Sequence, residues 1–233
     1  MLAAIAVTPS APVLVPGLAG AAAAEVDAVR AAALRAAAAL PARWIAVGAG
    51  GAERVLGPAT RGSYAGYGVD VAVTLGPEAP DRPVELPLCA LWAGWLRGQV
   101  NPGGRVEVRV FGSDTPAGEA VSLGRALRAE IDRMDEPVGV LVVADGANTL
   151  TQAAPGGYDP AAQQAQDALD DALAAGDPGA VAELATGSVG RVAYQVLAGL
   201  AGPSACPARE LARAGPFGVG YFVGVWIPDA AAP

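Results

Sequence analysis

Two short segments of this chain carry the side chains best suited to chemistry. Ser10 follows an apolar run at residues 2–7, and Asp145 and Asn148 follow a wholly apolar run at residues 138–143. A serine hydroxyl can act as a nucleophile only beside a base, while a carboxylate can serve as a base or bind a cation. Each also has a simpler alternative: Ser10 can satisfy loop backbone, and Asp145 or Asn148 can form an Asx-type turn with neighbouring backbone.

The basic residues restrict this chemistry strongly. The chain contains no histidine, and all 15 of its basic residues are arginines. The absence of histidine excludes a Ser-His-Asp triad, a Cys-His pair and a two-histidine-one-carboxylate iron site. The absence of lysine excludes Schiff-base chemistry and a P-loop lysine. Asp145 is therefore the candidate catalytic residue, as a base or a cation ligand, although no spaced ligand motif predicts a metal site.

The cysteines and the paired aspartates are less promising. Cys89 lies in an apolar segment, which predicts a buried and inert thiol, whereas Cys206 lies in a loop and is expected to be more exposed. Two cysteines are too few for a disulfide scaffold. Asp170 and Asp171 belong to an acidic, glutamine-rich segment and are expected on a solvated helix face.

A glycine-rich segment at residues 47–53 partly matches a dinucleotide-binding fingerprint. The full G-x-G-x-x-G pattern would require glycine where this chain has Glu53, and a carboxylate there would approach the pyrophosphate. The segment that follows does not have a clear helical pattern. We therefore interpret Gly48, Gly50 and Gly51 as a turn after a strand.

The elements that must position these residues alternate between strand and helix patterns. Strands are expected at residues 2–7, 44–47, 69–74, 105–111, 138–143 and 219–227. Helices are expected at residues 18–40, 86–96, 123–134, 160–175 and 180–200, the last with a break at 187–190. This alternation predicts one α/β domain over residues 1–233, with a central mixed sheet flanked by helices on both faces. Because ligands bind at the carboxyl ends of strands in such sheets, the segment after residues 138–143 is a candidate binding loop.

Composition and charge exclude several classes of partner. The net charge is −8 and the arginines are scattered, so neither nucleic acid nor an anionic membrane surface is an expected partner. No stretch reaches the roughly 20 apolar residues of a membrane span. No basic residue precedes Arg30, so we do not expect a signal peptide. We therefore expect a cytoplasmic location. The alanine-rich apolar surfaces suggest a homodimer.

Three segments together resemble one enzyme family. Residues 8–16 (Thr-Pro-Ser-Ala-Pro-Val-Leu-Val-Pro), 145–160 and 215–223 occur in the order found in class III extradiol ring-cleaving dioxygenases of the catalytic LigB type. The similarity extends to an uncharacterised actinobacterial branch of LigB-like proteins. The resemblance implies the fold and an active-site cleft. The family opens catechol-type rings with O₂, using Fe(II) held by two histidines and a glutamate, with another histidine as acid/base.

The chain departs from this family where the metal should bind. Ser10 stands where the first metal histidine is expected, the Gly48–Gly50 turn where the second would follow, and Asn148 near the acid/base histidine. The stretch at residues 186–191 offers no acid for the glutamate ligand. Neutral hydroxyls and glycine backbone are poor Fe(II) ligands, so neither metal nor cofactor is expected. The resemblance implies a ligand-binding cleft lined by Ser10, Pro12, Gly48, Gly50, Asp145, Asn148 and Tyr158.

These observations lead to three hypotheses. The first is a LigB-like protein that has lost the Fe(II) ligands and binds a small molecule or a partner without catalysis. The second is an enzyme of altered chemistry in the same cleft, an oxidoreductase of aromatic compounds or a hydrolase, with Asp145 as base or cation ligand. The third is a structural or regulatory subunit that pairs with an active homologue.

Overall fold

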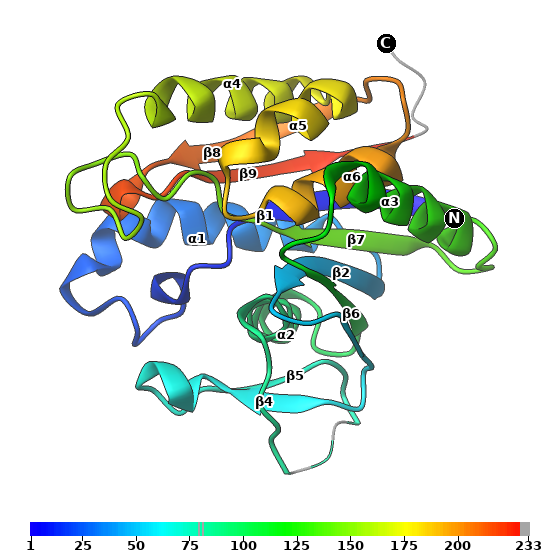
Figure 1. Ribbon diagram of the computed structural model, residues 1–233. Coiled ribbons are helices and arrows are strands. Elements are labelled where there is room, and N and C mark those ends of the chain that lie inside the picture. The colour runs from blue at the N-terminus through cyan, green and yellow to red at the C-terminus, as the bar shows by residue number, and fades with distance from the viewer. Residues whose placement is uncertain (79, 81, 229–233) are drawn as a thin grey trace.

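A seven-stranded mixed sheet forms the centre of the molecule (Figure 1). The computed structural model describes residues 1–78, 80 and 82–228, apart from the side chain of Ala21. The strands lie in the order β3-β6-β2-β7-β1-β9-β8. The four that pair in parallel are β1 (Leu2–Thr8), β2 (Arg43–Gly50), β6 (Arg105–Gly112) and β7 (Val138–Val143). The three that pair antiparallel are β3 (Arg54–Leu56), β8 (Ala208–Ala214) and β9 (Tyr221–Trp226).

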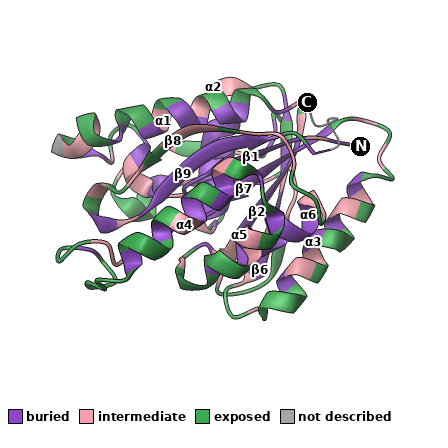
Figure 2. Cartoon of the chain, turned by 90° about the horizontal axis from the view of Figure 1, so that it is seen from above, coloured by how far each residue is buried: buried purple, intermediate pink, exposed green. Residues whose placement is uncertain are grey.

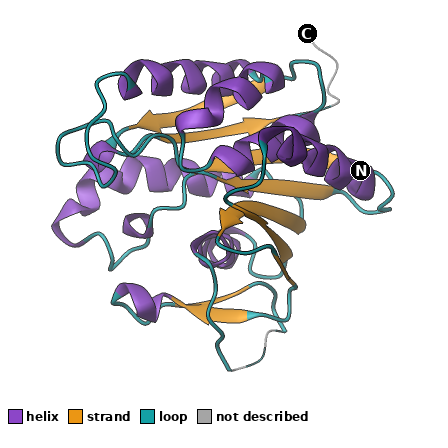
Figure 3. Cartoon of the chain, viewed as in Figure 1, coloured by secondary structure: helices purple, strands orange, loops and turns teal. Residues whose placement is uncertain are grey.

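Helices cover both faces of this sheet, as Figures 2 and 3 show. One face packs against α1 (Ala23–Ala38) and α2 (Leu88–Val100). The other face packs against α3 (Ala117–Ile131), α4 (Ala162–Ala175), α5 (Pro178–Leu184) and α6 (Arg191–Ala201). Alternate residues of β1 belong to the two cores, since Ala4 and Ala6 face one and Ile5 and Val7 the other. The predicted α/β fold with helices on both faces is confirmed.

The sequence patterns predicted most of these elements well. All six residues of β7 are buried, as expected for a central strand covered on both faces. In β6 the predicted alternation is also present, because Val106, Val108 and Val110 are buried between more exposed neighbours. The break between α5 and α6 is a short 3-10 helix (Ala185–Gly187) and a turn before Arg191.

Four strands differ from the prediction: one is shorter and lies outside the central sheet, and three were not predicted. Of residues 69–74, only β5 (Ala72–Thr74) is a strand, and it pairs with β4 (Arg61–Ser63) outside the central sheet. Asp70 instead accepts a hydrogen bond from the Ser63 hydroxyl at 2.7 Å, which holds residues 63–70 as a local loop. The edge strand β8 was missed because its sequence, Ala-Arg-Glu-Leu-Ala-Arg-Ala, consists of helix-favouring residues. Pairing with β9 overrides that preference.

The chain leaves β1 and β7 in opposite directions. These two strands are parallel neighbours in the sheet, with Thr8 beside Val143. The chain after β1 continues to α1 on one face, whereas the chain after β7 continues to α4 on the other. Such a switch point opens a crevice at the carboxyl ends of the strands, the usual ligand position in open α/β sheets.

The helices themselves are those of a globular fold. In the described part of the chain, none is both long enough and apolar enough to cross a membrane.

Candidate functional site

Ser10 and Asp145 meet at the switch point between β1 and β7. The backbone N–H of Ser10 donates to Oδ1 of Asp145 at 2.9 Å, and the Ser10 hydroxyl donates to Oδ2 at 2.8 Å. Both residues are partly exposed. The carboxylate therefore joins two loops separated by 135 positions in the sequence. The Asx-turn alternative for Asp145 is wrong, and so is the alternative that the Ser10 hydroxyl satisfies loop backbone.

The surroundings of Asp145 disfavour its charge. Burial raises the pKa of this carboxyl, while the two hydrogen bonds from Ser10 oppose that shift. Tyr194 and Tyr221 lie close enough to interact with it electrostatically. Burial raises the pKa of both phenols, and the nearby Asp145 charge raises them further. The Tyr194 hydroxyl donates to the carbonyl oxygen of Ala144 at 3.1 Å, which fixes the residue just before Asp145.

Backbone contacts hold the Asp145 loop from two sides. The N–H of Gly146 donates to the Gly220 carbonyl, and the N–H of Gly220 donates to the Ala147 carbonyl, both at 2.8 Å. On the other side, the N–H of Gly190 donates to the Asp145 carbonyl at 2.8 Å. A methyl group added at Gly190 would lie 2.7 Å from Cα of Ala144. The Asp145 backbone is thus fixed between β9 and the start of α6.

The glycines at the end of β2 lie in closely packed surroundings. A methyl group added at Gly48 would lie 2.7 Å from Sγ of Cys89, and one added at Gly50 would lie 2.8 Å from Cγ1 of Val110. Cys89 is buried as predicted, and burial raises its pKa to about 11. The position where the family resemblance expects a metal histidine therefore has no room for a side chain.

The interpretation of this glycine segment as a dinucleotide site is excluded. Strand β2 continues through Gly50, so the prediction of a turn is wrong for Gly48 and Gly50, which lie within the strand. The chain then forms β3, which pairs antiparallel with β6. A dinucleotide site needs a helix N-terminus directly after the glycines, where it would face the pyrophosphate.

The donor groups at the switch point do not fit an Fe(II) ion. They are one carboxylate already bonded twice to Ser10, together with hydroxyl groups, and Fe(II) sites of this kind need imidazole. Within the described residues, no three acidic or cysteine side chains gather closely enough to hold a metal ion.

The other residues predicted to line the cleft make contacts of their own rather than hydrogen bonds to Ser10 or Asp145. Pro12 begins the short 3-10 helix Pro12–Leu14, directly after Ser10. The backbone carbonyl oxygen of Asn148 accepts a hydrogen bond from the N–H of Gly156 at 2.9 Å, and the Asn148 side chain packs against that glycine. Tyr158 lies in the same loop and is half-exposed. Of the seven predicted residues, Ser10 and Asp145 are the two that share a direct hydrogen bond in the described structure, and the wider cleft stays a prediction.

A small pocket adjoins the Asp145 loop on the side of α4. Its volume is about 120 Å³, and Ala147, Thr149, Gln166, Leu184 and Ser188 contribute to its lining. Gln166 is also one of the few buried polar residues, together with Asp170. The prediction of a solvated face for Asp170 was therefore wrong, although Asp171 is exposed as expected. The spacing of Ala162, Gln166, Leu169 and Leu173 along one helical face would have revealed the burial of this face.

Comparisons with known proteins support the fold alone. No family model matches the chain, and no curated protein matches it significantly. Among solved structures it is similar to the uncharacterized protein JW3007 from Escherichia coli K12, with a TM-score of 0.59 and 12% identity. The similarity covers 97% of this chain and 99% of that one.

Proposed function

We propose that this chain is a small-molecule-binding protein on a LigB-like scaffold, with the Ser10–Asp145 pair in place of a metal centre. The observation that carries the proposal is the double hydrogen bond from Ser10 to a single carboxylate at the switch point of the sheet. The bond positions the carboxylate before any ligand arrives. The packing of Cys89 beside Gly48 also supports binding without iron.

The chemistry of the pair indicates the kind of ligand. An ionised carboxylate has about four lone-pair positions, so each Asp145 oxygen can accept a second hydrogen bond beside the one from Ser10. A molecule with two adjacent hydroxyl groups can donate to both oxygens at once. Catechol is the simplest aromatic compound with this arrangement.

Calorimetric titration with catechol tests this proposal. We expect binding by protein treated with a chelator, with a dissociation constant of about 1 mM or tighter. Asp145→Asn is expected to weaken it about tenfold or more, since hydrogen bonds to a charged acceptor are the stronger ones. Asp132→Asn, at an exposed position on the C-terminal side of α3, is the matched control. The proposal fails if catechol does not bind, or if both variants bind as the wild type does.

A second candidate function rests on the 2.8 Å contact between the Ser10 hydroxyl and Asp145. A carboxyl whose pKa is raised by burial is a better proton acceptor when ionised. Asp145 could then take the Ser10 proton while Oγ attacks an ester carbonyl, with release of the alcohol and hydrolysis of the acyl-serine by water.

Hydrolysis of 4-nitrophenyl acetate distinguishes the two candidates. Under the binding proposal, the wild type releases 4-nitrophenolate no faster than Ser10→Ala or Asp145→Asn. Turnover that both substitutions abolish, and that Ser122→Ala on α3 leaves unchanged, would favour the hydrolase instead.

A further inference from the structure

Two buried hydrogen bonds connect the Asp145 loop to α4, outside the Ser10–Asp145 pair. The N–H of Ala147 donates to Oε1 of Gln166 at 2.7 Å, and Nε2 of Gln166 donates to Oδ1 of Asp170 at 2.7 Å. Gln166 is 4% exposed and Asp170 is 5% exposed. The direction of the amide is set at both ends, because its oxygen must accept from Ala147 and its nitrogen must donate to Asp170.

The Gln166 side chain lies between two glycines of the site. A methyl group added at Gly146 would lie 2.7 Å from Cδ of Gln166, and one added at Gly220 would lie 2.8 Å from Nε2. These are the glycines whose backbones join the Asp145 loop to the start of β9. The amide therefore fills the space behind the loop and bonds directly to it.

We propose that Gln166, held by Asp170, is the positioning residue of the Asp145 loop and sets the geometry of the Ser10–Asp145 pair. The inference rests on the proposed function for the role of that pair. Loss of the amide leaves the buried N–H of Ala147, two residues after Asp145, without its acceptor. Such a buried donor is costly to leave unpaired, so the loop would move to find another partner.

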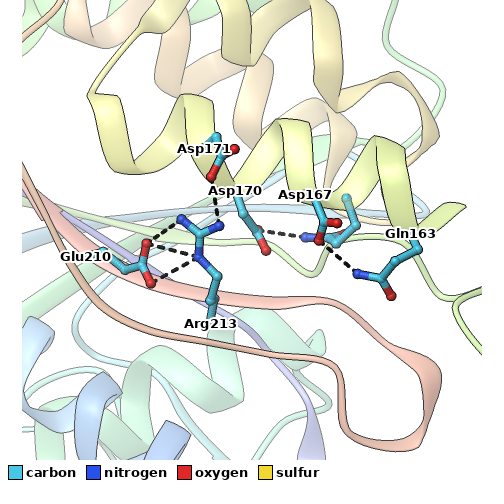
Figure 4. Close-up of polar contacts among 7 residues, drawn as sticks. Gln163, Asp167, Asp170, Asp171, Glu210 and Arg213 are labelled. Carbon is cyan, nitrogen blue, oxygen red and sulfur yellow. Dashed lines mark hydrogen bonds and ion pairs between the residues drawn. The ribbon is translucent and has the colours of Figure 1, made fainter.

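The same helix carries an exposed copy of this contact. Gln163 donates to Oδ1 of Asp167 at 2.8 Å, one turn before Gln166 and Asp170 (Figure 4). The two pairs have the same residue types and the same spacing of four. Because Gln163 and Asp167 are both exposed, whereas Gln166 is buried against the Asp145 loop, Gln163→Met is a matched control for Gln166→Met.

The charged groups around Asp170 determine how it responds to pH. Burial raises the pKa of Asp170 to about 6. The hydrogen bond from Gln166 and the charge of Arg213 lower this pKa, whereas the charges of Glu210 and Asp167 raise it further. Arg213 is itself bonded to Glu210 and to Asp171, as Figure 4 shows. Tyr194 of α6 also senses the Asp170 charge. Gln166 connects this carboxyl to the Asp145 loop.

Amide NMR of the ligand-free protein tests the inference without reference to any ligand. In the wild type, the Ala147 amide shift should change with pH with an inflection near 6. The part of this change that follows the Asp170 midpoint should vanish in Asp170→Asn and Gln166→Met and persist in Gln163→Met, whereas any part that follows Asp145 remains in all three variants. Hydrogen exchange at Ala147 should accelerate about tenfold or more in Gln166→Met, and not in Gln163→Met.

Exchanging the amide and the carboxylate between positions 166 and 170 distinguishes two roles of Gln166. One is to hold the Asp145 loop by a hydrogen bond, and the other is only to fill the space behind it. Gln166→Glu alone keeps an acceptor for Ala147 but faces Asp170 with a second carboxylate. Gln166→Glu combined with Asp170→Asn restores a donor opposite the new carboxylate, so the protection of the Ala147 N–H from exchange should return to its wild-type value. The inference is overturned if Ala147 shows no inflection while Asp170 titrates, or if the folded double variant leaves Ala147 unprotected. Because no ligand is present, failure here leaves catechol binding as an independent question.

Discussion

At the residue scale, the two hydrogen bonds from Ser10 to Asp145 are the contact on which the proposed function depends. A carboxyl whose pKa is raised by burial is a candidate acid or base when it lies at the edge of a sheet. Here two hydrogen bonds from Ser10 stabilise the charged form against the cost of burial. The balance between these effects can be measured directly.

Removing the Ser10 hydroxyl should raise the pKa of Asp145. Ser10→Ala deletes one of the two donors that lower this pKa, so the rise caused by burial is opposed only by the backbone N–H. Titration of the Asp145 carboxyl carbon by ¹³C NMR measures the midpoint, with Ser122→Ala as the control for an exposed serine hydroxyl. A midpoint that stays in place or falls would show that the hydroxyl does not stabilise the carboxylate.

Asp170→Asn should stabilise the protein at neutral pH and not at acidic pH. The folded protein binds the Asp170 proton more tightly than the unfolded chain, because burial raises the pKa from 3.8 to about 6. The stability that this carboxyl contributes is therefore complete below about pH 4 and is lost as pH rises through 6. The advantage of the variant should grow by about 2–3 kcal/mol over this window.

Urea unfolding at pH 4 and pH 7.5 measures this difference. Asp167→Asn removes an exposed carboxylate from the same helix and corrects for the loss of a charge. An advantage of equal size at both pH values would contradict the assignment of the raised pKa to Asp170.

At the element scale, glycines determine how closely α3 and α6 approach. A methyl group added at Gly124 of α3 would lie 2.9 Å from the backbone N of Leu200 and would also collide with the carbonyl oxygen of Val196. Gly199 of α6 faces the backbone of α3 in the same way, against Val121 and Arg125. The second face of the sheet thus depends on backbone-to-backbone packing of these two helices.

Gly124→Ala should therefore destabilise the protein although alanine favours helices. Overpacking of this kind costs about 1–3 kcal/mol and exceeds the gain in helix propensity. Gly118→Ala on the same helix meets open space and should be neutral or stabilising by up to about 1 kcal/mol. Thermal unfolding compares the two variants. If both substitutions stabilise, α3 and α6 are not packed as closely as described.

Elements with clear periodicity could be predicted from the sequence, and elements formed by pairing could not. The strands β6 and β7 follow from their valine patterns, because burial on one or two faces selects the side chains. The edge strand β8 has no such pattern, and its conformation depends on the hydrogen bonds that β9 offers. For the same reason β4 was not predicted, and β5 was assigned to the central sheet.

At the scale of the whole molecule, the topology brings the site together. The positions of Ser10 and Asp145 after apolar runs could be read from the sequence, since carboxyl ends of parallel strands share one edge. Their direct hydrogen bond could not be predicted, because it depends on β1 and β7 being neighbours in the sheet and being followed by helices on opposite faces. The buried Gln166–Asp170 contact was missed because charged and amide residues on a helix usually face solvent.

The ¹³C signal of the Asp145 carboxyl during a catechol titration tests the central claim most directly. The protein is treated with a chelator, so that iron cannot mediate the interaction. We predict a saturable shift of this signal in the wild type, at catechol concentrations that match the calorimetric dissociation constant, and binding that is about tenfold weaker or more in Asp145→Asn. A signal that stays in place until Fe(II) is added would contradict a binding site made by Ser10 and Asp145 alone.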